Sequence, residues 1–182
     1  MDSIKPLIEL GHIHYGENKV QEAVEKWSIE KKNNNKIKLH LIGKLQTNKV
    51  KFCFPLFDYI HSLDNVKLAK KISSFQTKLN FRPKIFIQVN IGNENQKNGI
   101  QVNDLENFKD ECVKNLNLDI VGLMCIPPNN KEPSSFFKLM KNLNEKYSLK
   151  ELSMGMSSDY KDAIKYGATF VRIGSKIFGQ RI

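Results

Sequence analysis

The sequence is poor in several features that would each indicate a particular class of protein. It contains only three cysteines, an odd number with no Cys-x-x-Cys spacing, which argues against a disulfide framework or a zinc site. No apolar run approaches the roughly 18–20 residues that a membrane-spanning helix needs. The opening segment MDSIKPLIEL also lacks the basic start and long apolar middle of a signal peptide. We therefore expect a cytoplasmic protein that binds neither a metal nor a membrane.

Arginine is also scarce, although the formal net charge is +10. The 29 basic residues comprise 26 lysines and three arginines, and 19 asparagines accompany them. Nucleic-acid-binding surfaces favour arginine, because its planar guanidinium matches phosphates and bases, and they often add aromatic stacking platforms. Lysines spread over many segments instead indicate solvated surfaces. We therefore do not expect nucleic-acid binding.

Short apolar segments alternate with amphipathic ones along all 182 residues, which predicts a single domain. Such alternation is typical of parallel strands joined by helical crossovers. The expected strands are residues 12–15, 39–42, 59–63, 85–90, 120–126, 151–154 and 170–173. The expected helices are residues 3–10, 20–30, 66–78, 104–115, 133–147 and 159–166. Asn65 and Asn103 are expected to cap the helices that follow them.

Two architectures fit this alternation, namely an open doubly wound sheet and a closed barrel. The sequence lacks the glycine-rich phosphate loops GxGxxG and GxxxxGK[ST], which disfavours a doubly wound nucleotide-binding domain. A barrel of this type has eight strands, whereas the pattern predicts seven with a helix before the first. We therefore expect a TIM-like (β/α) barrel of parallel strands that lacks its first strand. It should have an opening beside residues 12–15 and two exposed sheet edges.

Two turns rich in serine and glycine follow the last two expected strands. Residues 153–159 read SMGMSSD, and residues 171–175 read VRIGS. The loops after the last two strands of many barrels bind phosphate, and backbone N–H groups at a strand-to-helix turn can hold an anion. The two turns together therefore predict a phosphate clamp at the ends of these strands. The alternative is that they are plain strand-to-helix connections, which commonly have this composition.

The histidines and Cys125 lie within expected strands. His40 lies in an apolar run, where a hydrogen-bonded role in the core is more common than catalysis. His12, His14 and His61 alternate with apolar residues but show no metal-ligand spacing. Cys125 lies in an apolar strand without an obvious base nearby, so we do not expect it to act as a nucleophile.

Six segments together resemble the YggS/PROSC family of pyridoxal-phosphate homeostasis proteins, which is similar to the N-terminal barrel of alanine racemase. They are HYGENKVQEA, LHLIGKLQTNKVK, VNIGNENQKNGI, VGLMCIPP, LSMGMSSDYKDAI and VRIGSKIFGQR, and the resemblance extends from about residue 4 to residue 181. It implies that the chain binds pyridoxal 5′-phosphate. The implied phosphate ligands are Ser157, Gly174 and Ser175, with serine at position 175 where the family usually has threonine. Arg172 would lie near the pyridine ring, and Asn18 would line the pocket.

The chain departs from this family in one respect. The family's first strand carries an AVSKT-like segment whose lysine forms a Schiff base with the cofactor, and the sequence contains no such segment. Lys5 belongs to the expected helix after that strand. Lys44 and Lys176 lie next to strand ends, but a Schiff-base lysine needs a lowered pKa and a fixed aim at the aldehyde. We do not expect either to replace the missing lysine.

The resemblance implies a cofactor carrier that acts in vitamin B6 homeostasis and in amino-acid or keto-acid balance. Racemisation is not expected, because a racemase needs bases on both faces of the cofactor-bound substrate. Two alternatives remain, namely a small phosphate-ester enzyme on the same barrel and a degenerate fragment that binds no ligand. We expect a monomer, with association through the open sheet edge as the alternative.

Overall fold

Seven parallel strands form one sheet in the computed structural model, which describes residues 1–94 and 98–179. Each strand pairs with the next one in the sequence, in the order β1-β2-β3-β4-β5-β6-β7. The strands are β1 (His14–Glu17), β2 (Lys38–Leu41), β3 (Tyr59–Leu63), β4 (Lys84–Gln88), β5 (Ile120–Met124), β6 (Glu151–Met156) and β7 (Phe170–Arg172). The expected parallel (β/α) barrel is confirmed.

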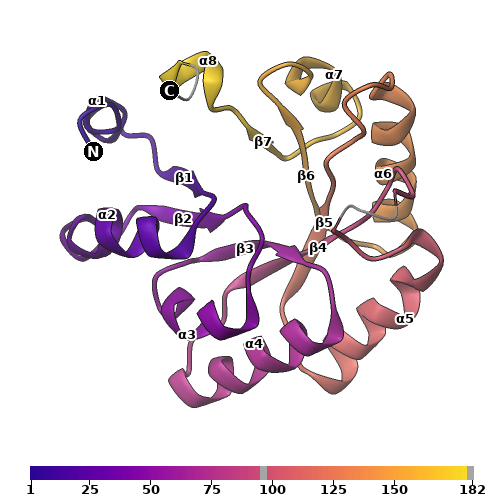
Figure 1. Cartoon of the computed structure of the whole chain (residues 1–182), viewed down its shortest axis with the longest axis horizontal. Coiled ribbons are helices and arrows are strands. Elements are labelled where there is room, and N and C mark those ends of the chain that lie inside the picture. Colours follow the sequence, from indigo (N-terminus) through magenta and orange to yellow (C-terminus); the bar gives the residue numbers. More distant parts are fainter. Residues whose placement is uncertain (95–97, 180–182) are drawn as a thin grey trace.

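Helical segments connect the strands and surround the sheet on its outer side (Figure 1). The longer helices are α2 (Val20–Asn33), α4 (Val66–Leu79) and α6 (Ser134–Lys146). The shorter segments are α1 (Lys5–Glu9), η1 (Thr47–Lys49), α3 (Val50–Cys53), η2 (Val102–Asp104), α5 (Leu105–Asp110), η3 (Glu111–Asn115), α7 (Tyr160–Lys165) and α8 (Ser175–Phe178). No helix among the described residues is long and apolar enough to span a membrane.

The hydrophobic core lies between the sheet and its helices. In α4, Leu68, Ala69 and Ile72 are buried and recur at the spacing of one helical face. The backbone N–H of Leu68 donates to Oδ1 of Asn65 over 2.8 Å, which confirms Asn65 as the N-cap. The cap expected at Asn103 is wrong, because that residue lies inside η2.

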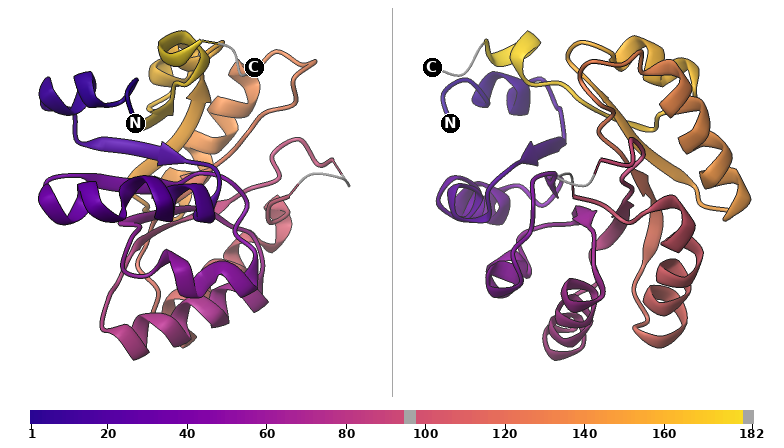
Figure 2. Two further views of the ribbon diagram at one scale, coloured as in Figure 1. Left: turned by 60° about the vertical axis from the view of Figure 1, so that its left-hand side comes forward. Right: turned by 45° about the vertical axis from the view of Figure 1, so that its right-hand side comes forward.

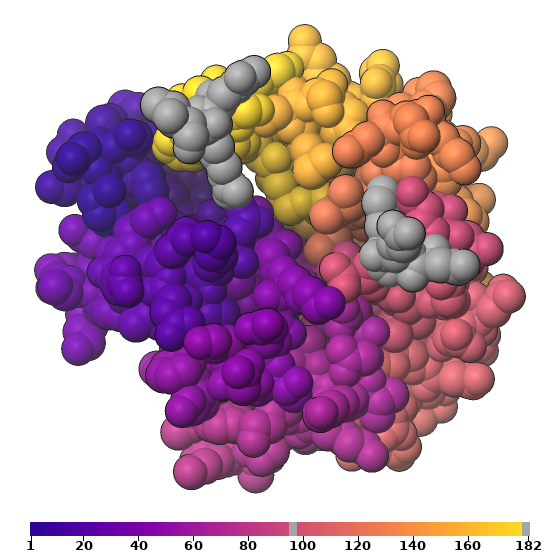
Figure 3. Space-filling model, in the orientation of Figure 1, coloured from indigo at the N-terminus to yellow at the C-terminus, as the bar shows by residue number. Residues whose placement is uncertain are grey.

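The sheet does not close within the described residues, because β1 and β7 each pair with only one neighbouring strand. The two further views show β1 and β7 on either side of this opening (Figure 2). The N-terminal residues, in indigo, and the C-terminal residues, in yellow, lie near one another on the surface (Figure 3). Inside the barrel, the rings of His14 and Phe170 approach to 5.9 Å between centroids. The opening expected beside the first strand is therefore present.

Candidate functional site

All five expected site residues lie at the carboxyl ends of strands. Asn18 follows β1, and Ser157 follows β6. Arg172 is the last residue of β7, and Gly174 and Ser175 come directly after it. Because parallel strands of a barrel end on the same face, all five residues belong to the face on which barrels carry their sites.

A hydrogen bond joins the two serine- and glycine-rich turns. The backbone N–H of Gly174 donates to Oγ of Ser157 over 3.2 Å. A Cβ atom added at Gly174 would meet no atom within 4 Å, so the space beside this backbone is open. Ser175 begins α8, where a backbone N–H group has no acceptor within its own helix. The structure therefore brings a hydroxyl and backbone donors together at one open point.

The turn after β6 is held by its own residues. Gly155 has φ +91°, and a Cβ there would lie 2.6 Å from Cβ of Ala163 in α7. Only glycine fits this combination of a left-handed backbone and close helix packing. The carboxylate of Asp159 accepts the backbone N–H of Met156 over 2.6 Å. These contacts fix the direction in which the chain leaves β6 and thus the place of Ser157.

Arg172 reaches across β6 to the end of β5. Its Nη1 donates to Oγ of Ser153 over 2.7 Å, and its Nη2 donates to the carbonyl oxygen of Cys125 over 2.8 Å. Burial lowers the pKa of Arg172 from its ordinary value, but the guanidinium of an arginine stays protonated in proteins. No carboxylate of the described residues lies within ion-pair distance of it. The guanidinium therefore has neutral partners and N–H groups left to donate to a ligand.

Three histidines on β1, β2 and β3 continue this polar arrangement through the barrel. Nδ1 of His61 lies 2.8 Å from Oγ of Ser153, and Nε2 of His61 lies 2.9 Å from Nδ1 of His40. Nε2 of His40 lies 2.9 Å from Nδ1 of His14. We call His14, His40 and His61 the histidine row. The row links Arg172, through Ser153, to the edge strand β1.

Burial keeps the histidine row neutral at pH 7. It lowers the pKa of His40 to about 3, with smaller contributions from His14 and Lys31. It also lowers the pKa of His61 well below the usual value, and the charges of His40 and Arg172 act in the same direction. The pKa of His14 is lowered as well, first by burial. Neutral imidazoles have one donor and one acceptor nitrogen each, so the row can form a continuous hydrogen-bonded chain.

Sequence reasoning placed His40 in the core but missed the histidine row and Ser153. The segments HIHYG, LHLIG and YIHSL contain His14, His40 and His61. Because side chains of a strand alternate between its two faces, these three histidines can all point to the interior of the barrel. Comparing these positions between neighbouring strands would have provided a signal for the row. The partner on β6 is 92 residues away from His61 in the sequence, so no local pattern identifies it.

Other chemistry is not supported by the described residues. They contain no group of three or more histidine, cysteine or acidic side chains that could hold a metal ion. Burial raises the pKa of Cys125 to about 12, so its thiol stays protonated and is a poor nucleophile.

The lysines near the strand ends have other contacts. Lys44 donates to Oδ1 of Asn98 over 2.7 Å, and Nζ of Lys176 lies 4.9 Å from the ring centroid of Tyr160. The lysines within the strands are the first residues of β2 and β4, at the opposite face of the barrel from Ser157. No lysine of the described strands therefore lies at the face that carries the site.

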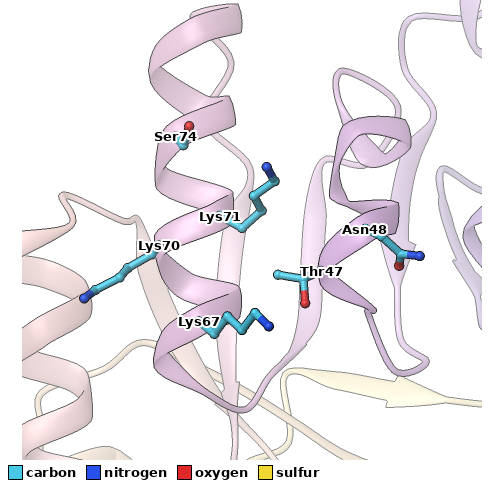
Figure 4. A pocket seen from close by; sticks show the side chains of 6 residues that line it. All are labelled: Thr47, Asn48, Lys67, Lys70, Lys71 and Ser74. Atoms are coloured by element: carbon cyan, nitrogen blue, oxygen red, sulfur yellow. The ribbon is translucent and has the colours of Figure 1, made fainter.

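A surface groove of about 440 Å³ lies away from these residues, between η1 and α4. Lys67 and Lys71 point toward Thr47, whereas Lys70 points away (Figure 4). The three lysines are exposed, and none of the lining residues is an expected site residue.

Asn18 has a structural reason for its place beside the site. A Cβ atom at Gly43, in the loop after β2, would lie 2.1 Å from the carbonyl oxygen of Asn18. The glycine thus allows the loops after β1 and β2 to touch. Asn18 is exposed, and the hydrogen bonds of Ser157, Arg172 and Gly174 in the described part of the chain go to other residues.

Comparisons with known proteins agree with this arrangement. The family model "Alanine racemase, N-terminal domain" matches residues 3–182. The pyridoxal phosphate homeostasis protein of Aquifex aeolicus (strain VF5) is 38% identical over 176 residues, which cover 92% of this chain and 76% of that protein. The chain belongs to the pyridoxal phosphate homeostasis family.

Solved structures place this family member close to PipY of Synechococcus elongatus PCC7942. PipY without PLP has a TM-score of 0.89 at 34% identity, covering 98% of this chain and 87% of PipY. The structure of PipY with PLP bound has a TM-score of 0.87 at the same identity and coverage. An alanine racemase of Clostridium difficile 630 has a TM-score of 0.73 at 15% identity, covering 98% of this chain and 48% of the racemase. That likeness shows the shared fold only.

Proposed function

We propose that this protein binds pyridoxal 5′-phosphate at the carboxyl ends of β6 and β7 and acts as a carrier of the cofactor in vitamin B6 homeostasis. The observation that carries the proposal is the hydrogen bond between Gly174 and Ser157, because it unites two donor-rich turns of a kind that binds phosphate. The PLP-bound structure of the family member PipY supports the choice of ligand. Amino-acid and keto-acid balance would then depend on the cofactor that the protein holds.

The residues present fit this cofactor. The hydroxyl of Ser157 and the backbone at Gly174 and Ser175 would hold the phosphate, in the open space beside Gly174. Arg172 would face the ring with the N–H groups that its protein partners leave free, and Asn18 would line the rim of the pocket. When bound, the cofactor supplies an aldehyde that reacts with amines. The protein's own groups would bind and orient it.

The test measures binding of pyridoxal 5′-phosphate and of pyridoxal, which lacks the phosphate, by isothermal titration calorimetry. Ser157→Ala should weaken binding of pyridoxal 5′-phosphate by about 1–3 kcal/mol, because a hydrogen bond to a charged group is lost. The same variant should leave the affinity for pyridoxal nearly unchanged.

Ser158→Ala is the matched control, since Ser158 is the exposed neighbouring serine. It should bind both compounds as the parent does. Absence of binding by the parent would contradict the proposal and favour a fragment without a ligand. Turnover of a sugar phosphate would favour a phosphate-ester enzyme instead.

We further propose a cytoplasmic, monomeric protein. All three cysteines are buried and unpaired, which fits a reducing compartment. The edge strands β1 and β7 have four and three residues, and edges this short limit pairing with other chains. Sedimentation velocity would test the oligomeric state.

A further inference from the structure

A line of polar side chains crosses the interior of this barrel, where barrels of this type usually carry branched apolar side chains. The histidine row and Ser153 occupy inward positions of β1, β2, β3 and β6. Consecutive hydrogen bonds connect them to one another and to Arg172. Burying so many polar groups is costly unless each one finds a partner. Which nitrogen of each histidine carries its proton decides how the Ser153 hydroxyl is oriented toward Arg172.

Counting protons leaves two possible directions for the row. Each contact between two imidazoles uses one proton, and each neutral imidazole has one. In the first direction, the Ser153 hydroxyl donates to Nδ1 of His61, and Nε2–H of each histidine donates to the next one toward His14. In the second direction, His61 donates to Ser153, and the Ser153 hydroxyl proton then has no acceptor among the described residues.

Arg172 selects the first direction. Its Nη1–H occupies one lone pair of the Ser153 oxygen, and its positive charge favours a hydroxyl whose proton points away from it. His61 accepts that proton, and His40 accepts the next one along the row. The last N–H, Nε2–H of His14, belongs to a half-buried side chain, whereas His40 and His61 are buried.

We infer that Ser153 and His61 are positioning residues for Arg172, which hold its guanidinium in place and leave its remaining N–H groups aimed at the ligand. The inference rests on the proposed function, because the ligand at Arg172 is the ring of pyridoxal 5′-phosphate. Ser153 supplies the oxygen that fixes Nη1, and His61 fixes the hydroxyl of Ser153 so that this oxygen stays directed at the arginine. His40 and His14 complete the row by satisfying the buried N–H groups.

The first arm of the test requires no ligand. In ¹⁵N-labelled protein, all three histidines of the row should carry their proton on Nε2, and the Nη signals of Arg172 should report restricted rotation. The assignment is simple because the sequence has only three arginines. His61→Leu and Ser153→Ala should release the guanidinium, so that its Nη signals average. A proton on Nδ1 of His61, or an unchanged Arg172 in both variants, would overturn the inference.

The second arm measures affinity for pyridoxal 5′-phosphate and for pyridoxal. His61→Leu and Ser153→Ala should weaken binding of both compounds by roughly tenfold, since the ring contact is lost whether or not a phosphate is present. Ser157→Ala should weaken only the phosphate ester. His61→Asn should restore most of the affinity, because its amide oxygen can accept the Ser153 hydroxyl proton.

Phe86→Leu controls for a general loss of packing. The ring of Phe86 stacks on His61 at 4.2 Å between centroids but takes no part in the hydrogen bonds. This variant should be less stable, yet it should keep the restricted Arg172 signals and the parent affinity. Equal losses in Phe86→Leu and His61→Leu would overturn the inference. If the parent binds neither compound, the proposed function fails, while the ligand-free arm still decides whether the row positions Arg172.

Discussion

Lowering the pH from 7 to 5 should destabilise this protein, and His40 should account for a defined part of the loss. Burial lowers the pKa of His40 from 6.5 to about 3 in the folded state. Between these two values the unfolded chain binds a proton that the folded chain does not, so the free energy of unfolding falls as the pH falls. With an unfolded pKa of 6.5, the loss between pH 7 and pH 5 is about 2 kcal/mol from this residue.

Urea denaturation at the two pH values measures this loss. Trp27 is the only tryptophan of the chain and is fully buried, so its fluorescence reports unfolding. His40→Gln should reduce the difference in unfolding free energy between pH 7 and pH 5 by about 2 kcal/mol relative to the parent. The parent's total loss should be larger than this, because the lowered pKa of His61 acts in the same direction.

His12→Gln is the control, since His12 is exposed and lies outside the histidine row. This variant should keep most of the parent's loss of stability between pH 7 and pH 5, because His40 is unchanged in it. The reasoning would be refuted if the parent were equally stable at both pH values. It would also be refuted if His40→Gln kept the parent's full pH dependence, because the loss would then come from other groups.

Three further predictions concern the side chains around the site. Glu17→Ala should lower the unfolding free energy by about 2–3 kcal/mol in urea melts, because Glu17 accepts the buried indole N–H of Trp27 over 2.7 Å; a stability equal to the parent's would contradict this. Gly155→Ala should cost about 2–4 kcal/mol and also weaken binding of pyridoxal 5′-phosphate, since its Cβ would strain the turn and press on Ala163. Borohydride reduction with pyridoxal 5′-phosphate, followed by peptide mapping, should label several lysines substoichiometrically. Stoichiometric labelling of one lysine would overturn this last expectation.

The sheet was predictable because each strand carries its own local signal. The bounds of β3 match the expected residues 59–63, and the other strands differ from expectation by a few residues at their ends. For β1 the reason is specific. The backbone N–H of His12 donates to the carbonyl oxygen of Leu7, so His12 still belongs to the turn that ends α1 and the strand begins at His14.

Some helices were predicted less well because tertiary contacts decide them. The expected helix at residues 104–115 divides into η2, α5 and the π-helical segment η3. The segment from Thr47 to Cys53, with η1 and α3, was not expected as a helix. It is too short to show a helical period, and the burial of Val50 and Cys53 holds it against the core.

Of the contacts at the site, those between neighbouring strands were predictable from the sequence, and those between distant strands were not. The meeting of Ser157 and Gly174 follows from the sequence, because consecutive parallel strands end side by side. The contact of His61 with Ser153 does not, since it joins β3 to β6 across the barrel. It depends on strand registers, and the pairing of β3 with β4 and of β4 with β5 shifts along the strands.

The buried charge of Arg172 explains why the polar line must extend as far as β1. A guanidinium inside a barrel needs acceptors, and an acceptor such as the Ser153 hydroxyl brings a proton that must in turn be accepted. An apolar residue at His61 or His40 would leave one buried N–H or O–H without a partner, so the chain of groups can end only where water reaches it. In this protein that place is His14, which is half-buried, whereas His40 and His61 are buried. The histidine row and Ser153 are therefore one arrangement, in which each group is a hydrogen-bond partner of the next, from His14 to the guanidinium of Arg172.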